Sequence, residues 1–377
     1  MEIVYLSDTN PVYKALEEAL LKNQFGFLHD REYHKQMLSD DFESKRINQF
    51  FESSLTQDMR PDEFSAVRDR YFPDFVELPT RLDAPLPFLI LKEVVSQLRG
   101  FLEKIGSFKI PPYACIPLGH VNAQCVEVGE QKTAFVLINS QLLFFCHQMS
   151  KGFATAIPRL KLEQDNLHLV APQKAIRNHL KKCDLPGRII HAALHAYCVE
   201  GDLYRAPFFE TPKNAMRFAD LFVTEMELFV FSHEISHLYQ GHLSLEKRSR
   251  SENWSIKGES DADGLGFFFA ATTLVEKGMP LRHASIGIFL FFGALLLGER
   301  YSALVATGCD QGFQDIASES HPSIIHRISK LASQVEYMTN GKMKAANLKS
   351  SLFLFLEELW AATMIAKSRA EELDKRT

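Results

Sequence analysis

The clearest pattern in the chain is a set of apolar residues that recur at helical spacing before and within residues 229–242. No proline occurs between Pro212 and Pro280, so nothing in this stretch forbids a continuous helix. Gly241 follows at a position where a helix can end. The pattern therefore predicts a buried, mostly apolar helix that ends near Gly241. Its apolar positions are Leu221, Phe222, Met226, Phe229, Val230 and Leu238.

Three other stretches have apolar residues that predict helices. Residues 89–105 and residues 352–370 each gather theirs on one face, as an amphipathic helix does. Residues 286–298 form an apolar run of 13 residues before Glu299, whereas a membrane span needs about 20 residues. We therefore expect a buried core helix at 286–298 and no stable membrane span.

Strand-like segments are confined to residues 110–145. Within them, Gly129 and Glu130 separate two strand-like runs, which predicts a β-hairpin. Residues 1–75 are polar and helix-prone, and a proline-rich connection over residues 72–87 follows, with a domain boundary expected near residue 85. The chain is therefore expected to be α+β and mainly helical, with a small antiparallel sheet. A helical N-terminal region at 1–85 and a C-terminal helix at 341–377 are expected to flank the central part.

The long predicted helix carries the sequence H-E-x-x-H, formed by His233, Glu234 and His237. On an α-helix, residues four apart lie one above the other, so the two imidazoles face the same way. Two neutral imidazoles can hold one zinc ion, and Glu234 then lies beside the open position of the metal. There it can take a proton from a zinc-bound water and deliver it to a leaving amine. This is metallopeptidase chemistry.

A zinc site of this kind needs a third ligand, and the chain offers two candidates. His242 is close, but it is out of register by one residue with the pattern H-E-x-x-H-x-x-G-x-x-H. Glu259 and Asp263 stand four residues apart, so on a helix both face one way. We expect Glu259 to be the third ligand and Asp263 to accept a hydrogen bond from the far ring nitrogen of His233. The alternative is that these acids form the solvated start of a helix.

Together these motifs resemble those of the gluzincin zinc peptidases, and more specifically the family of the CaaX-prenyl proteases and HtpX-type heat-shock proteases. H-E-x-x-H is followed by E-x-x-A-D at residues 259–263 and by S-H-P-x-x-x-x-R-I at residues 320–328. Upstream, residues 121–124 and 134–143 are similar to that family's N-A-F strand and to the strand and helix start that follow it. The segments occur in the family's order over about residues 110–335.

The resemblance implies a zincin-like peptidase domain at residues 86–340 that holds one Zn²⁺ per chain. Residues 150–215 match no part of the family pattern and are interpreted as an insertion, for which a role in substrate selection is a hypothesis. The insertion carries a second pair of histidines four residues apart, His191 and His195. Because no carboxylate or cysteine accompanies them at ligand spacing, we expect ordinary helix residues there rather than a second metal site.

Four further residues receive roles from the resemblance. Asn122 and Ala123 are expected on an edge strand that pairs with the extended backbone of a substrate, with an ordinary surface strand as the alternative. His321 is expected to donate to the oxyanion of the reaction or to fill the open zinc position at rest, with a histidine in a helix-capping loop as the alternative. Arg327 is expected to pair with one of the acids of the site.

Composition limits the class of protein. The chain has 377 residues, 46% of them hydrophobic, and a formal net charge of −5. Such a length suits one large domain or two, and the mild acidity argues against general nucleic-acid binding. The six cysteines include no C-x-x-C pair, and the first residues lack the features of a signal peptide. We therefore expect reduced thiols and a cytoplasmic protein.

The sequence thus predicts a zinc-dependent endopeptidase that acts on a protein or peptide substrate, with Glu234 as the general base. Two alternatives stay open. One is a non-enzymatic regulator or protein-binding module with a structural zinc site, in which Glu234 would have little use. The other is a dedicated single-target cytosolic protease in the style of the phage-exclusion protease Lit or the repressor-cleaving ImmA type.

Overall fold

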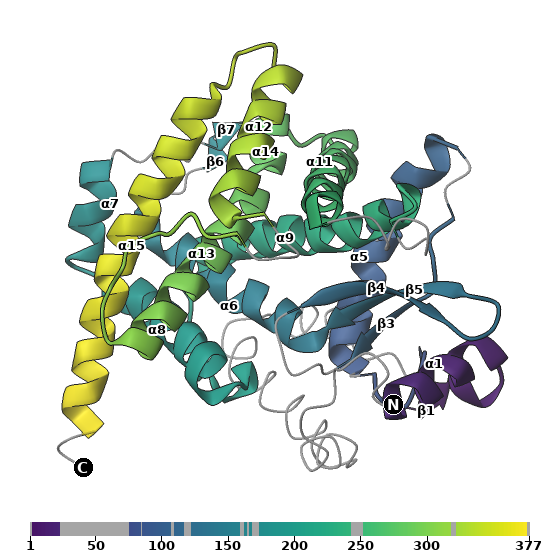
Figure 1. Cartoon of the computed structure of the whole chain (residues 1–377). Coiled ribbons are helices and arrows are strands. Elements are labelled where there is room, and N and C mark those ends of the chain that lie inside the picture. The colour runs from purple at the N-terminus through teal and green to yellow at the C-terminus, as the bar shows by residue number, and fades with distance from the viewer. Residues whose placement is uncertain are drawn as a thin grey trace. The chain divides into compact units, whose positions relative to one another are not determined.

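The structure is a computed structural model that describes residues 2–22, 75–83, 85–106, 109–116, 122–158, 162–163, 166–167, 173–242, 252–317 and 322–374. These residues are mainly helical with small sheets, which confirms the expected α+β, mainly helical class (Figure 1). The chain divides into two compact units, Met1–Leu143 with Phe208–Glu210 and Phe144–Pro207 with Thr211–Thr377. The boundaries expected near residues 85 and 340 stay predictions.

Helices account for most of the described residues. The α-helices are α1 (Pro11–Leu21), α5 (Pro85–Lys104), α6 (Ser140–Ala156), α7 (Gln173–Leu180), α8 (Leu185–His195), α9 (Lys213–Tyr239), α11 (Glu252–Glu276), α12 (Leu281–Ala284), α13 (Ile286–Thr307), α14 (Ile324–Met338) and α15 (Ala345–Asp374). A π-helical turn at Ala196–Glu200 follows α8, and short 3-10 turns lie at Leu6–Asp8 and Leu203–Arg205. The strands are β1 (Glu2–Tyr5), β2 (Phe75–Leu78), β3 (Tyr113–Ile116), β4 (Ala123–Val128), β5 (Thr133–Asn139), β6 (Leu162–Glu163) and β7 (Asn166–Leu167).

A three-stranded sheet in the order β3-β5-β4 organises the first unit. The antiparallel hairpin of β4 and β5 is confirmed, and Gly129 takes a φ of 71° in its turn, where a residue without a side chain is favoured. The expectation of an antiparallel sheet was wrong for two other pairings, because β3 pairs with β5 in parallel and β1 pairs with β2 in parallel, whereas β6 and β7 are antiparallel. Residue patterns indicate strands, but they do not fix the direction of a pairing between distant segments.

The core of the first unit lies between α1 and this sheet. Leu16 and Leu20 of α1 are fully buried in one apolar cluster with Phe135 and Leu137 of β5. Asp83 ties the turn after β2 to β3, since its carboxylate accepts hydrogen bonds from the Thr80 hydroxyl and from the Cys115 amide at 2.8 and 2.6 Å. The helix expected over 89–105 is confirmed as α5.

The second unit is a helical assembly around α9 and α13. The long helix predicted before Gly241 is confirmed as α9, and the C-terminal helix is confirmed as α15. Figure 1 shows α15, in yellow, running along α7 and α8, and α15 contacts both of these helices. The histidines of the H-E-x-x-H motif lie near the C-terminal end of α9, on a helix whose last three turns are largely buried.

Helix α13 contains the apolar run that the sequence analysis assigned to the core. The helix is longer than the 13-residue run, because it continues through Glu299 and Arg300 to Thr307. Leu281–Thr307 is, within the described ranges, the one stretch long and apolar enough to cross a membrane, and 78% of its most apolar window is buried inside the structure. A core helix has this length, composition and burial, which accords with the expected core position.

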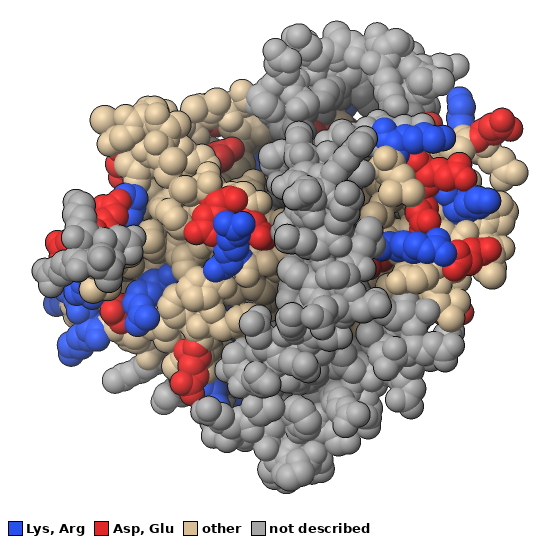
Figure 2. All heavy atoms as spheres, turned by 90° about the horizontal axis from the view of Figure 1, so that it is seen from below, with Lys and Arg blue, Asp and Glu red and all other residues tan. Residues whose placement is uncertain are grey.

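Charged side chains of both signs are mixed on the face that Figure 2 displays. Over the described part of that face, lysine and arginine side chains lie beside aspartate and glutamate side chains and do not gather into a patch of one sign. A broad field of one sign is what attracts a polyanion such as nucleic acid. The described part of this face offers none.

Candidate metal centre

Helix α9 carries the two histidines of the candidate site. His233 and His237 stand one helical turn apart, and their ring centroids are 4.7 Å apart with nearly perpendicular planes. Their Nε2 atoms approach to 3.1 Å, so both rings present the same nitrogen to one point. Glu234 lies between them on the same helix and is 7% exposed. Burial of three polar residues side by side is costly unless partners satisfy them.

Helix α11 brings those partners. It packs so closely on α9 that a Cβ at Gly266 would lie 2.8 Å from the backbone nitrogen and the Cα of His233. At the other end of this contact, the Gln240 side-chain amide donates to the backbone oxygen of Asp261 at 2.9 Å. The result is that Glu259 and Asp263, one turn apart on α11, both face the histidines.

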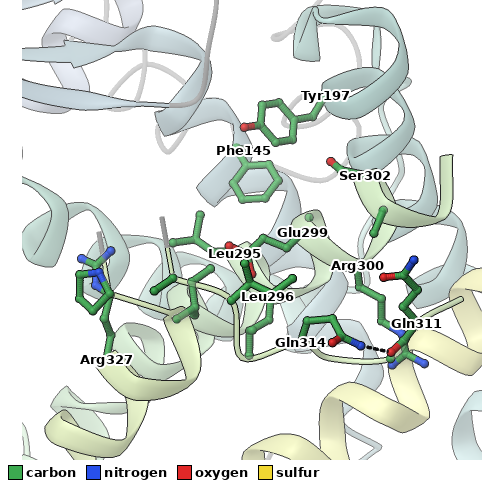
Figure 3. Close-up of a pocket in the computed structure, with 17 residues that line it drawn as sticks. Phe145, Tyr197, Leu295, Leu296, Glu299, Arg300, Ser302, Gln311, Gln314 and Arg327 are labelled. Atoms are coloured by element: carbon green, nitrogen blue, oxygen red, sulfur yellow. Dashed lines mark hydrogen bonds between the residues drawn. The ribbon is translucent and has the colours of Figure 1, made fainter. Parts of the chain in front are cut away.

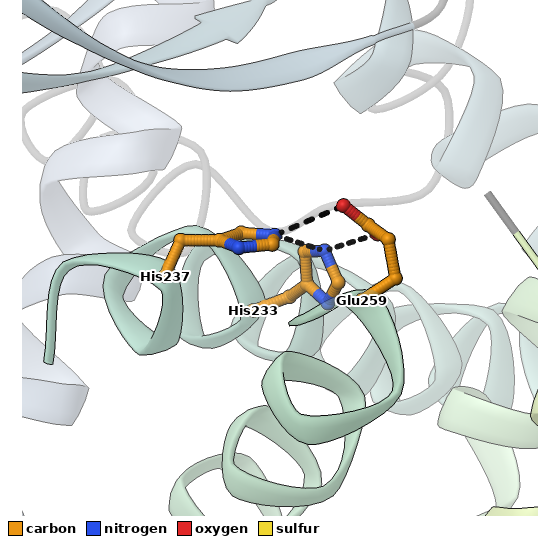
Figure 4. A group of neighbouring side chains, drawn as sticks. All are labelled: His233, His237 and Glu259. Atoms are coloured by element: carbon orange, nitrogen blue, oxygen red, sulfur yellow. Dashed lines mark hydrogen bonds and ion pairs between the residues drawn. The ribbon is translucent and has the colours of Figure 1, made fainter. Parts of the chain in front are cut away.

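Donor atoms of three residues converge at this place. Oε2 of Glu259 lies 3.4 Å from Nε2 of His233, and Oε1 of Glu259 lies 3.4 Å from Nε2 of His237. With the 3.1 Å between the two ring nitrogens, the carboxylate and the imidazoles form a compact triangle (Figure 4). Among the described residues, it is the one group of three or more His, Cys, Asp and Glu side chains that could hold a metal ion.

The two imidazoles and the carboxylate lie close enough together to share one tetrahedral zinc ion. Zinc binds imidazole nitrogen and carboxylate oxygen at about 2.0–2.2 Å, so neighbouring ligands of a regular tetrahedron stand roughly 3.3–3.5 Å apart. The 3.1 Å between the two ring nitrogens comes close to that spacing, and so do the two distances of 3.4 Å, each of which joins one ring nitrogen to a different oxygen of the Glu259 carboxylate. Two imidazoles and one carboxylate are also a donor set that catalytic zinc sites use, and they leave a fourth position open. The residues present therefore fit a zinc ion.

Asp263 orients the first histidine. Its Oδ1 lies 3.0 Å from Nδ1 of His233, the ring nitrogen that points away from the donor triangle. The same carboxylate accepts two hydrogen bonds from Arg327 of α14, at 2.7 and 2.6 Å. Asp263 is 1% exposed, so the carboxylate is held between a guanidinium and an imidazole in the interior. A carboxylate behind a metal-binding histidine fixes which ring nitrogen carries the proton.

The charges of the site favour a cation. Burial alone would lower the pKa of His233, but hydrogen bonds to Asp263 and Glu259 outweigh it and raise the pKa to about 10. Burial and the charged His233 ring lower the pKa of His237 to about 3. Burial would also raise the pKa of Asp263, but Arg327 and His233 lower it to about 2. His233 therefore holds an extra proton at neutral pH. Its ring and the guanidinium of Arg327 are the positive groups of the site, and the carboxylates of Glu234, Glu259 and Asp263 are the negative ones.

His242 does not belong to the triangle. Gly241 ends α9 with a φ of 66°, and the amides of Gly241 and His242 donate to the backbone oxygens of Leu238 and His237 at 2.9 Å each. This Schellman cap turns the chain back and brings Nδ1 of His242 to 2.9 Å from Nδ1 of His237. His242 therefore contacts the nitrogen of His237 that faces away from Glu259. His242 is therefore placed to orient the His237 ring and not to act as a third metal ligand.

An apolar layer lies behind the histidines. Phe229, one turn before His233 on α9, packs its ring 5.8 Å from Phe291 and 5.3 Å from Phe292 of α13. The guanidinium carbon of Arg327 lies 5.0 Å above the ring of Phe292. These contacts exclude water from one side of the site, where hydrogen bonds and ion pairs are stronger than in water.

The acids at 259–263 are not a solvated helix start. Helix α11 begins at Glu252, so Glu259 and Asp263 lie two to three turns inside it. Their side chains are 13% and 2% exposed, whereas Asp261 between them is exposed. The helix therefore separates the two inward acids from the outward one, as the spacing of four residues predicts.

The remaining predicted residues lie elsewhere. Asn122 and Ala123 belong to the first unit, where Ala123 begins the edge strand β4 and its amide donates to the Asn122 side chain at 2.9 Å. The placement of that unit relative to the metal group is not determined. His321 lies outside the described residues. The helix after it begins at Ile324, with Ser323 as N-cap.

Sequence reasoning missed one feature of this region entirely. Arg327 and Glu299 both line a cavity beside the metal group, and no spacing in the chain connects them. For His242 a signal was present, because a glycine two residues past a helix end predicts a cap that folds the next side chain back on the last turn.

No protein-family model matches the chain, and comparison with curated proteins and with solved structures finds no match.

Proposed function

We propose that this chain is a zinc-dependent endopeptidase with a zincin-like core. The observation that carries the proposal is the convergence of His233, His237 and Glu259 in one compact group of possible metal ligands, beside the buried Glu234. The H-E-x-x-H and E-x-x-A-D motifs and their resemblance to the gluzincins support the same function. We further propose that one Zn²⁺ binds per chain and that the protein is cytoplasmic.

Each residue has a defined task in this proposal. A zinc ion at the three donors supplies Lewis acidity, which lowers the pKa of a neighbouring water and polarises the substrate carbonyl. Glu234 accepts the proton of the attacking water as general base and then donates it to the leaving amine. Asp263, held by Arg327, keeps the Nδ1 proton on His233 and so keeps its Nε2 turned toward the triangle.

The outer parts of the site follow from the resemblance. Asn122 and Ala123 are proposed to pair with the extended backbone of a protein or peptide substrate as an added strand. His321 is proposed to donate to the oxyanion that forms at the carbonyl. Neither task is needed for the metal to bind, so the metal site and the peptidase activity can be tested apart.

The experiment compares four proteins purified with zinc supplied: the parent, Glu259→Ala, Glu234→Gln and the control Asp261→Ala, which removes an exposed acid two residues from Glu259. Elemental mass spectrometry should find about one zinc per chain in the parent, Glu234→Gln and Asp261→Ala, and clearly less in Glu259→Ala. Incubation with a mixture of cellular proteins, followed by mass spectrometry of new N-termini, should show cleavage by the parent and the control. Glu234→Gln should lower the rate by roughly 10²–10⁴-fold.

Three outcomes would contradict parts of the proposal. A parent without zinc would remove the metal site altogether. Zinc unchanged in Glu259→Ala would move the third ligand elsewhere. A zinc-loaded parent that makes no more N-termini than Glu234→Gln would leave a metal site without peptidase activity, which is the non-enzymatic alternative.

A further inference from the structure

A cavity of about 580 Å³ lies in the second unit, beside the metal group. Helix α13, the segment that follows it and the start of α14 form the cavity, with Phe145 of α6 and Tyr197 after α8 on another side. Figure 3 shows Arg327 at one end of the lining and Arg300 with Gln311 at the other. A cavity of this size is typical of sites for small molecules or for side chains of a bound peptide.

Of the two arginines that line the cavity, Arg300 is already neutralised by acids. Arg300 makes two hydrogen bonds with Asp310, at 2.7 and 2.8 Å, and one with Glu357 at 3.0 Å. Its guanidinium carbon also lies 4.5 Å from the centre of the Trp360 ring and 4.7 Å from that of Phe313. Neither acid lines the cavity, so the positive charge of Arg300 is satisfied from outside it.

Arg327 is likewise neutralised by an acid that lies outside the cavity lining. Both hydrogen bonds of Arg327 to Asp263 point from the cavity toward the metal group. Glu299 is then the charged lining residue that remains. No hydrogen bond or ion pair joins its carboxylate to another described residue, and only the more distant charge of Arg327 acts on it. The cavity therefore has a net negative charge at Glu299.

The walls around this carboxylate are mostly apolar. Leu295, Leu296 and Ile324 line the cavity, and the rings of Phe145 and Tyr197 lie 5.6 Å apart. Partial burial raises the pKa of the Glu299 carboxyl to about 6, against the lowering effect of Arg327. Apolar walls favour an alkyl chain and aromatic rings attract a cation.

We propose that this cavity binds an alkylammonium or guanidinium group, with the carboxylate of Glu299 as its counter-ion and the apolar walls around its alkyl chain. The group is supplied by a lysine or arginine side chain of a peptide or by a free amine of the same chemistry. The inference does not rest on zinc binding or on peptide cleavage. Arg327 of the lining also bonds to Asp263 behind His233, so the cavity and the metal group share this ion pair.

The test uses the full-length protein without added metal, so that it stays separate from the peptidase proposal. Pentylamine, agmatine, Nα-acetyl-lysine methylamide and its uncharged norleucine counterpart are titrated, and binding is followed by calorimetry and ligand-observed NMR. We expect the three cationic probes to bind and the norleucine compound to bind at least tenfold more weakly. Affinity for the cations should fall at least tenfold in Glu299→Gln and recover in part in Glu299→Asp.

The control variant is Glu372→Gln, which removes one negative charge from an exposed position of α15 outside the cavity. It should bind the probes as the parent does. Tighter binding of the lysine derivative than of pentylamine would indicate a peptide side chain, and the reverse a free amine. Equal binding of the lysine and norleucine compounds, or equal losses in Glu299→Gln and Glu372→Gln, would overturn the proposal. Circular dichroism checks that each variant is folded.

Discussion

Two pairs of histidines stand four residues apart on helices of the second unit, and only one of them forms a candidate metal site. His191 and His195 of α8 have ring centroids 5.7 Å apart with planes tilted by 34°. His233 and His237 of α9 have centroids 4.7 Å apart with planes at 84°, and their Nε2 atoms nearly touch. The same spacing in sequence therefore allows either arrangement.

The difference comes from the helix that each pair faces. Helix α11 gives the α9 pair a carboxylate at 3.4 Å from each ring and a second one behind His233. His195 on α8 has instead the Tyr301 hydroxyl at 3.4 Å from Nδ1 and the Glu200 carboxylate at 3.8 Å from Nε2. The lesson is that an i, i+4 pair becomes a metal site only when a second element supplies the other donors and orients the rings.

The largest expected effect is on metal content when one ring of each pair is removed. His237→Ala should lose nearly all bound zinc, because two donors without the second imidazole hold zinc poorly. His195→Ala should keep about one zinc per chain. Elemental mass spectrometry after dialysis against metal-free buffer measures both. Equal loss in the two variants would break the comparison and place metal at α8 as well.

A smaller effect is expected from the acid behind each pair. Asp263→Asn keeps the shape of the side chain but removes the charge that satisfies Arg327 and orients His233. We expect zinc affinity to fall roughly 10–100-fold and the metal-free protein to lose about 3–5 kcal/mol of unfolding free energy, as when one partner of a buried ion pair is removed. Competition with a chelator and urea denaturation measure the two quantities.

The matched variant on α8 is Glu200→Gln. Its carboxylate stands 3.8 Å from an imidazole whose side chain is 44% exposed, and exposed pairs contribute about 0–1 kcal/mol. Unfolding free energy and zinc content should both stay near those of the parent. A loss as large as that of Asp263→Asn would contradict the view that the two acids differ in role.

A modest effect, smaller than that of Asp263→Asn, is expected on acid stability at His191. Burial, and to a lesser degree the neighbouring His195, lowers the pKa of His191 to about 4. The pKa of a histidine in an unfolded chain is about 6.5. The unfolded chain therefore binds a proton first, and the contribution of His191 to stability is present above pH 6.5 and lost as the pH falls toward 4. His191→Gln should reduce this acid-induced loss of unfolding free energy by about 1 kcal/mol, after allowance for partial exposure. Denaturation at pH 7.5 and 5.0 measures it, with pH 7.5 as the internal reference.

Local spacing accounts for what the sequence could predict. The proline-free apolar stretch specified α9, and the acids at 259 and 263 fall on one face of α11 because helical periodicity dictates it. The turn at Gly129 likewise specified the hairpin of β4 and β5. In each of these cases the residues that decide the structure lie within a few turns or one loop of each other.

What the sequence could not predict depends on distant segments that meet only in the fold. The parallel pairing of β3 with β5 is one example, and the cavity around Glu299 is another. Glu299 reads in the sequence as the polar end of an apolar run. Its isolation follows from Arg300 turning to Asp310 and Glu357 and Arg327 turning to Asp263, and no periodicity encodes those choices.

The contact at Gly266 has a consequence for which ion the proposed metal site would select. Because a single methyl group there would strike the backbone of His233, the gap between α9 and α11 is set by the absence of a side chain. That gap decides how far Glu259 stands from the two imidazoles, and hence the radius of the ion that the three can share. In the proposed site, Gly266 would therefore help to determine whether a small or a larger cation fits, although it provides no ligand itself.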